Sequence, residues 1–579
     1  METKVCQNCK NSFNIEPDDF SFYEKIKVPP PTWCPYCRTQ RRLIWRNERT
    51  LYQRECSLCN KSIVAMYPRS TIFPVYCREC WFSDNWDPLS YGKDYDFSKP
   101  FFVQFKELLN IVPQLALQVS KCVDSEYINQ TFNCKNCCLI TSGTDNEDCM
   151  YSNRLLYCKN VVDCFAVHKL ENSYEAIESR EGSNLFYSLD CHNSFDCVFC
   201  FDVRNSSNCF MSSNLRSKSY VWYNEQLTKE GYQQKIKTIS LSSYKNINKY
   251  KEDFEKLKKQ SVVHFSQQKK TENCTGNIIS NAKNAKNCFY VGEVENVKNL
   301  LFVDNSKESY DVNNGCCVME CMYEVNTTGV HCANVSFSSD VWPEVRNTAY
   351  SVSSRDGVND IFGCISLRKK SNCILNKEYS SEEYKILIDK IIEHMSEMPY
   401  IDELGKVYKY GEFFPLELSP FAFNESAAFT YTPLTKDQVN NNKWRWKDID
   451  DKSHVASIKN NEIPDSIDDI QDTIFKETIE CQHIKDNCEH QCTKAFRILE
   501  SELSFYRKMR IAVPRICPNC RHYERVKYMS QLTLNKRQCM CDKSGHEHEG
   551  KCQNEFETSH SSDRPEIVYC ESCYQQEVV

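Results

Sequence analysis

The sequence lacks most features by which common protein classes are identified. Its 579 residues include only 14 glycines, and no Gly-rich phosphate loop, nucleophile elbow or His-Glu-x2-His helix is present. The longest apolar stretch, 108–119, is broken by Pro113 and Gln114 and falls short of the roughly 20 residues of a membrane span. Nothing at the N-terminus resembles a signal peptide. We therefore expect a cytoplasmic protein with reduced thiols, no membrane association and no small-molecule substrate.

The net charge of −7 also argues against a general polyanion binder, whereas cysteine is abundant at 37 residues. Eight of these cysteines form four C-x2-C pairs near the N-terminus, and the same intervals recur near the C-terminus. Cys9 to Cys34 and Cys492 to Cys517 both span 25 positions, 37–56 and 520–539 both span 19, and 59–77 and 552–570 both span 18. The cassette is duplicated.

Two thiolate pairs of this spacing can complete the tetrahedral coordination of one Zn²⁺. We predict about four structural zinc ions, with treble-clef or zinc-ribbon-like modules at both ends of the chain. The predicted ligands are Cys6, Cys9, Cys34 and Cys37; Cys56, Cys59, Cys77 and Cys80; Cys488, Cys492, Cys517 and Cys520; and Cys539, Cys552, Cys570 and Cys573. A ten-residue insert in the last module carries Cys541, His546 and His548, which could hold an extra ion or form an open site. The alternative for all these cysteines is a disulfide framework.

A basic helix is predicted to leave the first metal site. Its arginines recur at spacings of three and four, and the C-terminal copy carries a similar set. Such a helix can meet nucleic-acid phosphates, or it can be a solvated face paired with Glu48 and Glu55. The candidate contacts are Arg38, Arg41, Arg42, Arg46, Arg521, Arg525 and Lys527.

The middle of the chain carries a short repeat in which a polar residue precedes a Cys, Tyr or Leu. The repeated residue falls at 164, 174, 185, 197, 209 and 220, and returns from 288 onward. This pattern indicates a parallel β-solenoid whose cysteines point inward as small apolar residues. Each step is one small coil, or two steps make one turn of a larger β-helix. The spacing leaves both open.

The solenoid is itself doubled, because Leu215, Arg216, Asn224 and Tyr232 recur at a shift of 152 as Leu367, Arg368, Asn376 and Tyr384. A mainly β protein with small α+β zinc modules follows, in which amphipathic helices cap the two solenoid halves. An aromatic connector precedes the C-terminal cassette and ends in an acidic run, Asp448 to Asp451; its aromatic rings pin it to a neighbouring domain or stack on bases. The expected units are a two-zinc cassette (1–97), an amphipathic helix (98–121), solenoid half 1 (122–225), a helical insert and linker (226–272), solenoid half 2 (273–378), a capping helix (379–400), the connector (401–475) and a second two-zinc cassette (476–579).

The paired Cys-Pro-x-Cys-Arg motifs, the Asn-Cys repeats, Tyr-Gly-Glu-Phe-Phe-Pro (410–415) and the closing Arg-Pro-Glu-Ile-Val-Tyr-Cys-Glu-Ser-Cys-Tyr resemble a family of cysteine-rich hypothetical proteins. These are predicted mainly from metagenomes of uncultivated, small-genome bacteria. The resemblance implies one continuous layout of zinc cassette, repeat and zinc cassette. It implies no catalytic residue.

Two functions of different class are consistent with the sequence. The protein is a zinc-binding scaffold that contacts RNA or a ribonucleoprotein through its basic helices, or a scaffold for a protein partner with structural zinc caps. A zinc-dependent hydrolase or nuclease is the less favoured alternative, because closed sets of four cysteines leave no open coordination position.

Overall fold

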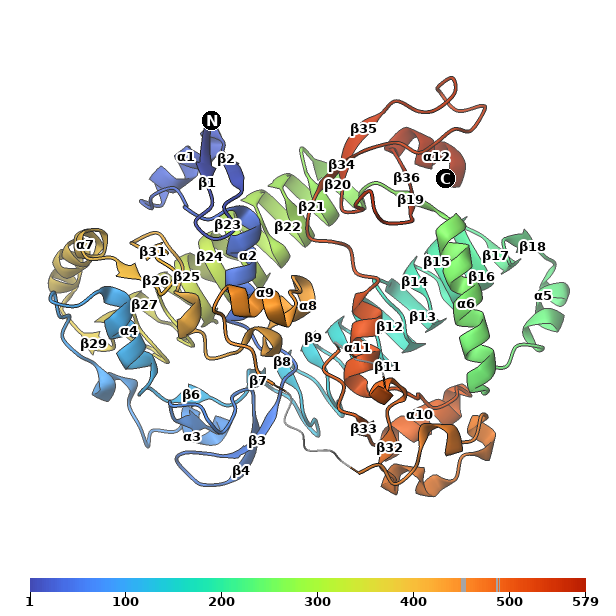
Figure 1. Cartoon of the computed structure of the whole chain (residues 1–579), viewed down its shortest axis with the longest axis horizontal. Coiled ribbons are helices and arrows are strands. Elements are labelled where there is room, and N and C mark those ends of the chain that lie inside the picture. The colour runs from blue at the N-terminus through green and yellow to red at the C-terminus, as the bar shows by residue number, and fades with distance from the viewer. Residues whose placement is uncertain (449–454, 486–487, 489) are drawn as a thin grey trace.

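Two β-solenoids lie side by side and form the body of the computed structural model, which describes residues 1–448, 455–485, 488 and 490–579 (Figure 1). The first solenoid is a 12-stranded sheet and the second a 10-stranded sheet, each built almost entirely from parallel strands. The predicted mainly β fold with a doubled solenoid is confirmed. Among the described residues, no helix is long and apolar enough to cross a membrane.

The first solenoid advances by one coil every 12 residues. Cys197 pairs with Cys209, and Leu185 pairs with Cys197. One step is therefore one coil, and the uneven steps of 10 and 11 expected between 164 and 185 are wrong. Its strands are β7 (Val119–Ser120), β8 (Asn129–Phe132), β9 (Thr141–Thr144), β10 (Asn153–Leu156), β11 (Lys159–Val162), β12 (Phe165–Tyr174), β13 (Arg180–Phe186), β14 (Leu189–His192), β15 (Phe195–Arg204), β16 (Ser207–Arg216), β17 (Ser219–Trp222) and the antiparallel β18 (Glu225–Gln226).

The coils of the second solenoid are 12 or 13 residues long, after a first step of 11 between Gln268 and Ile279. Ile279 pairs with Val291 at 12, whereas Val325 pairs with Ser338 at 13. Its strands are β20 (Gln268–Glu272), β21 (Gly276–Lys286), β22 (Cys288–Lys298), β23 (Leu301–Cys316), β24 (Met319–Gly329), β25 (Cys332–Val341), β26 (Arg346–Ala349), β27 (Asn359–Phe362), β28 (Ser371–Ile374) and the antiparallel β29 (Lys377–Glu378).

Each coil turns four corners, because about every third residue has a left-handed backbone. In one coil the φ angles of Phe199, Asp202, Asn205 and Asn208 lie between 52° and 53°. This conformation is costly for most residues, but Asn and Asp tolerate it. Their side chains also form ladders between coils, as where Asn136 donates to Asp148 over 2.6 Å. Asparagine and aspartate therefore occupy many of the corners.

Cysteines fill the interior of the first solenoid. Cys191, Cys197, Cys200 and Cys209 are fully buried and belong to one apolar cluster with aliphatic side chains. None of the described cysteines forms a disulfide, and the Cys197 thiol lies 3.4 Å from the Phe195 carbonyl oxygen. The interior cysteines act as small apolar residues, as expected.

Equivalent asparagines close the two solenoids. The side-chain oxygen of Asn224 accepts the Ser213 backbone N–H, and that of Asn376 accepts the Ile365 N–H, both over 2.8 Å. Helices cover the ends and sides: α4 (Phe101–Leu109), α5 (Lys229–Ile236), α6 (Tyr244–Gln260) and α7 (Ser381–Glu397).

A cysteine-bearing module lies at each end of the chain (Figure 1). The N-terminal module contains β1 (Glu2–Val5), β2 (Ser12–Ile15), α1 (Pro17–Lys25), α2 (Pro35–Ile44), β3 (Tyr52–Glu55), β4 (Ser62–Ala65), β5 (Val75–Tyr76), α3 (Arg78–Phe82), η1 (Pro88–Tyr91) and β6 (Gln114–Leu115). The C-terminal module contains β32 (Ile479–Glu480), η7 (Gln482–Lys485), β33 (Ala495–Phe496), α10 (Glu500–Met509), α11 (Pro518–Val526), β34 (Asn535–Gln538), β35 (Glu555–Thr558), β36 (Ile567–Tyr569) and α12 (Glu571–Val578). Strand β19 (Val262–His264) pairs with β36.

The connector packs between the two modules. Phe413 and Phe414 are buried, and the Phe414 ring lies 4.6 Å from that of Trp45. The Tyr431 hydroxyl donates to Glu48, and the Phe429 ring lies 5.5 Å from that of Tyr523 in α11. These aromatic residues pin the connector and are not free to stack on bases. Its elements are β30 (Tyr400–Ile401), β31 (Val407–Tyr408), η2 (Leu416–Leu418), η3 (Phe423–Glu425), α8 (Ala427–Tyr431), α9 (Lys436–Asn441), η4 (Asn460–Glu462), η5 (Ile467–Asp469) and η6 (Asp472–Lys476); beyond Asp448, the acidic run lies outside the described residues.

Candidate metal centres

The first two centres have the ligands that the sequence predicts. Cys6, Cys9, Cys34 and Cys37 form one group and Cys56, Cys59, Cys77 and Cys80 another, with all ligand atoms in each within 4.8 Å of one another. Cys9 Sγ lies 3.7 Å from Cys34 Sγ, and Cys59 Sγ lies 3.9 Å from Cys77 Sγ. Four sulfurs bound to one zinc at about 2.3 Å would be about 3.8 Å apart, so the groups fit the ion.

One feature of local geometry identifies the first ligand of every centre. The backbone N–H of the third cysteine donates to the sulfur of the first over 3.2 Å, from Cys34 to Cys6 and from Cys77 to Cys56. The third cysteine also caps a helix, so the positive end of the helix dipole faces the thiolates.

By this criterion the third centre differs from the prediction. The N–H of Cys517 donates to Cys481, and Cys481, Cys492, Cys517 and Cys520 form the group. Cys488 was wrong as the first ligand of this centre, because the knuckle is enlarged by an insertion and its true first cysteine lies seven residues earlier. Cys488 Sγ instead lies 3.7 Å from Cys520 Sγ and belongs to a second group with His483 and His490.

The fourth centre consists of Cys539, Cys552, Cys570 and Cys573, as predicted. Cys570 donates its N–H to Cys539, and Cys552 Sγ lies 3.9 Å from Cys570 Sγ. Its insertion brings Cys541 Sγ to 3.1 Å from His546 Nδ1, whereas His548 Nδ1 lies 2.9 Å from the Gly550 carbonyl oxygen.

Two of these thiols, Cys56 and Cys570, have a pKa below that of an ordinary cysteine. Burial opposes the charged form of Cys56, but N–H groups of Cys59 and Cys77 lower its pKa to about 7. Burial likewise opposes the charged form of Cys570, while Ser572 and Asn554 help to lower its pKa to about 6. Thiolates at neutral pH are the form that binds metal.

The arginines of α2 point into the protein. Arg41 pairs with Glu324 and with Glu412, each over 2.7 Å, and Arg38 pairs with Asp311 over 2.8 Å. Asp311 and Glu324 occupy corners of the second solenoid. Helix α2 is therefore clamped to that solenoid by fully buried ion pairs.

Helix α11 makes the corresponding contact with the first solenoid. Arg521 and Arg525 each pair with Asp163 over 2.6 Å, and Arg521 also pairs with Glu502 over 3.1 Å. A third contact with the first solenoid lies just after α2. Arg46 pairs with Glu48 over 2.8 Å, and Arg154 of the first solenoid pairs with the same carboxylate.

The expected nucleic-acid contact is wrong for six of its seven residues. Arg38, Arg41, Arg42, Arg46, Arg521 and Arg525 are between 0% and 4% exposed, so phosphates cannot reach them. Lys527 is exposed and pairs with Glu524. Sequence reasoning missed the acidic partners because Asp311, Glu324 and Asp163 lie about 270 to 360 positions away, in corners that look solvated.

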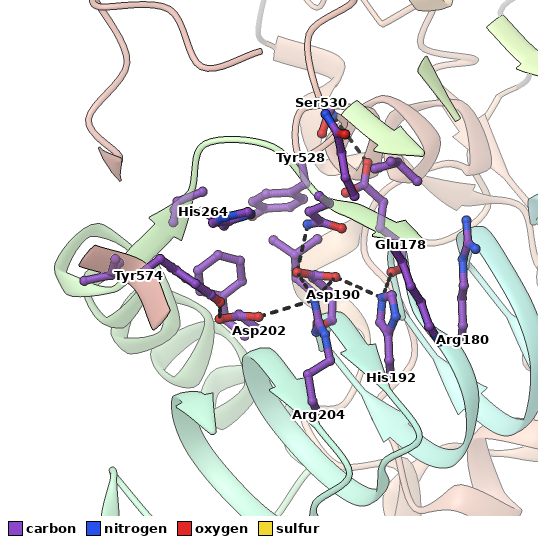
Figure 2. A pocket seen from close by; sticks show the side chains of 18 of the residues that line it. Glu178, Arg180, Asp190, His192, Asp202, Arg204, His264, Tyr528, Ser530 and Tyr574 are labelled. Atoms are coloured by element: carbon purple, nitrogen blue, oxygen red, sulfur yellow. Dashed lines mark hydrogen bonds and ion pairs between the residues drawn. The ribbon is translucent and has the colours of Figure 1, made fainter. Parts of the chain in front are cut away.

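A cavity of about 940 Å³ lies between the first solenoid, α6 and the C-terminal module. Ion pairs line this cavity: Arg204 pairs with Asp190 over 2.8 Å (Figure 2). Arg216 pairs with Asp202 over 2.9 Å. Burial raises the pKa of Glu178 to about 7, while the Tyr290 hydroxyl donates to the same carboxyl. The sequence analysis did not predict this cavity. The signal was present as basic residues at 12-residue intervals: His168, Arg180, His192, Arg204 and Arg216.

Comparisons with known proteins provide no functional assignment. No protein-family model and no curated protein matches the chain. One solved structure, named as an acetyltransferase from Desulfovibrio desulfuricans G20, aligns with 50% of this chain and 75% of its own at 9% identity. The TM-score of 0.10 is too low to indicate a shared fold.

Proposed function

We propose that the protein is a zinc-stabilised scaffold in which two metal modules hold two β-solenoids in a fixed arrangement. The observation that carries the proposal is the continuity from metal to solenoid. Cys34 caps α2, and Arg41 of this helix pairs with buried Glu324 of the second solenoid. Cys517 caps α11, and Arg521 of this helix pairs with buried Asp163 of the first solenoid. Zinc is the ion of choice because closed sets of four thiolates are typical of structural zinc sites.

Metal removal tests this role directly. Chelation should release both modules while the solenoids keep their β-type circular dichroism, since aliphatic and cysteine side chains pack together in the solenoid cores. Limited proteolysis before and after chelation would locate the released segments. Cleavage patterns that do not change on complete zinc removal would contradict the proposal.

We favour a protein as the partner of this scaffold. The six buried arginines are unavailable to phosphates, and the exposed ladders mix both signs of charge, as in Lys135–Glu147–Lys159. The net charge of −7 further disfavours a polyanion. When a tagged form of the chain is isolated together with its bound partner, that partner should therefore be a protein. Its binding should change little between low and high salt. Nuclease-sensitive binding that weakens steeply with salt would favour RNA instead.

The hydrolase alternative depends on Cys541, His546 and His548. It requires an activity that is lost in His546→Ala while the chain remains folded and keeps its four-cysteine centres.

A further inference from the structure

The insertions that enlarge the two C-terminal knuckles share a pattern of metal-binding side chains. In the N-terminal module, Cys6 and Cys9 are separated by two residues, as are Cys56 and Cys59. The corresponding cysteines in the C-terminal module are 481 and 492, and 539 and 552. At 2, 7 and 9 residues beyond the first cysteine, one insertion has His483, Cys488 and His490, and the other has Cys541, His546 and His548. Three ligand-type residues at the same offsets in both insertions indicate a shared role.

In the third centre, this triad meets a sulfur of the existing group. The ligand atoms of His483, Cys488, His490 and Cys520 all lie within 4.8 Å of one another. Cys488 Sγ is 3.7 Å from Cys520 Sγ and 3.9 Å from His483 Nδ1. In a tetrahedral zinc site, two sulfurs would be about 3.8 Å apart and a sulfur and a nitrogen about 3.6 Å apart.

Cys520 belongs to both groups at once. Its sulfur is 3.5 Å from Cys517 Sγ and 4.0 Å from Cys481 Sγ, within the four-cysteine centre. A thiolate sulfur has enough lone pairs to bind two metal ions. The Nδ1 atom of His490 is buried and has no hydrogen-bond partner among the described residues, although Glu524 lies 3.8 Å away.

We propose that His483, Cys488 and His490 bind a second Zn²⁺, which shares the thiolate of Cys520 with the ion of the four-cysteine centre. The mixed sulfur and imidazole donors suit zinc. Charge also favours the pair, because one Zn²⁺ with four thiolates carries −2, whereas two Zn²⁺ with five thiolates and two neutral imidazoles carry −1. A smaller net charge lowers the cost of burying the cluster. The second ion would tie His483, Cys488 and His490 to α11, which carries Cys520.

The inference depends on the proposed zinc-binding function and is tested by a difference in metal content. Replacing residues 482–491 with Gln-Asn, the pair between Cys6 and Cys9, restores a short knuckle and keeps Cys481 and Cys492. Elemental analysis of the full chain should show a loss of one zinc relative to the unchanged protein. His483→Ala combined with His490→Ala should have the same effect without shortening the chain. His331→Asn, at an exposed corner of the second solenoid, is the matched control and should lose none.

X-ray absorption at the zinc edge provides an independent measurement. Two ions that share one sulfur at about 2.3 Å lie within about 4.6 Å of each other. The full chain should give a zinc–zinc scattering contribution in this range, and the double histidine variant should lose it. Unchanged zinc content in a folded double histidine variant, or no zinc–zinc contribution in the full chain, would overturn the shared site. Absence of all zinc from the unchanged chain would instead overturn the proposed function.

Discussion

Loss of the Asp163 charge should detach the C-terminal module from the first solenoid. Asp163 is fully buried and pairs with Arg521 and Arg525 over 2.6 Å. Asp163→Asn retains a residue that tolerates the local φ of 54° and removes only the negative charge. Removing one partner from a buried ion pair costs about 3–5 kcal/mol. Arg521 keeps its pair with Glu502, whereas Arg525 loses the carboxylate with which it pairs.

This cost can be measured as susceptibility to a protease. When opening and closing are fast, cleavage follows the population of the open form, and each 1.4 kcal/mol changes that population about tenfold. We therefore expect the C-terminal module of Asp163→Asn to be cleaved about 100-fold faster or more under native conditions, with its zinc retained at the start. The matched control is Asp148→Asn, because Asp148 has a φ of 55° on the same solenoid but is not buried. The reasoning would be refuted if Asp163→Asn were cleaved at the rate of the control.

Three further predictions concern the ligands, the acid response and the solenoid cap. In a chain that already carries His483→Ala and His490→Ala, Cys481→Ser should remove a further zinc ion, that of the third four-cysteine centre, whereas Cys488→Ser should remove none; equal further loss in both variants, measured by elemental analysis, would contradict the assignment of Cys481. Burial opposes the charge on Glu48, but Arg154 and Arg46 hold its pKa at about 2 in the folded protein. The stabilising contribution of Glu48 is therefore present above about pH 4.5 and disappears as the pH falls toward 2. Chemical unfolding measured over a series of pH values should show that Glu48→Gln lacks this part of the acid dependence. Asn376→Ala should lower the free energy of unfolding by about 1–3 kcal/mol, because the buried N–H of Ile365 loses its acceptor, whereas exposed Asn334→Ala should have a smaller effect than Asn376→Ala.

The cysteine spacing was a reliable guide to the metal groups because ligand geometry is local. The interval from Cys492 to Cys517 identified the third centre, and the short knuckles of the N-terminal module were complete. The error at Cys488 has a simple cause. A second cysteine at ligand spacing lies closer to Cys492 than the true ligand, Cys481, does.

The repeat predicted the solenoid but not the uniform 12-residue step of its first half. Chemically different residues, such as Ser173 and Leu185, occupy equivalent positions of successive coils. Following only Cys, Tyr or Leu along the sequence therefore gave apparent steps of 10 and 11 residues. The burial of Arg38 and Arg41 could not be read from spacing, because their helical pattern matches that of a solvated basic face. Only the tertiary fold brings Asp311, Glu324 and Glu412 to them.

Metal analysis of the purified full-length chain, isolated without a reducing agent, tests the central claim most directly. The account predicts at least four zinc ions per molecule and no disulfide bonds among the cysteines of the two modules. A folded chain that contains no zinc and has those sulfurs oxidised in pairs would contradict it.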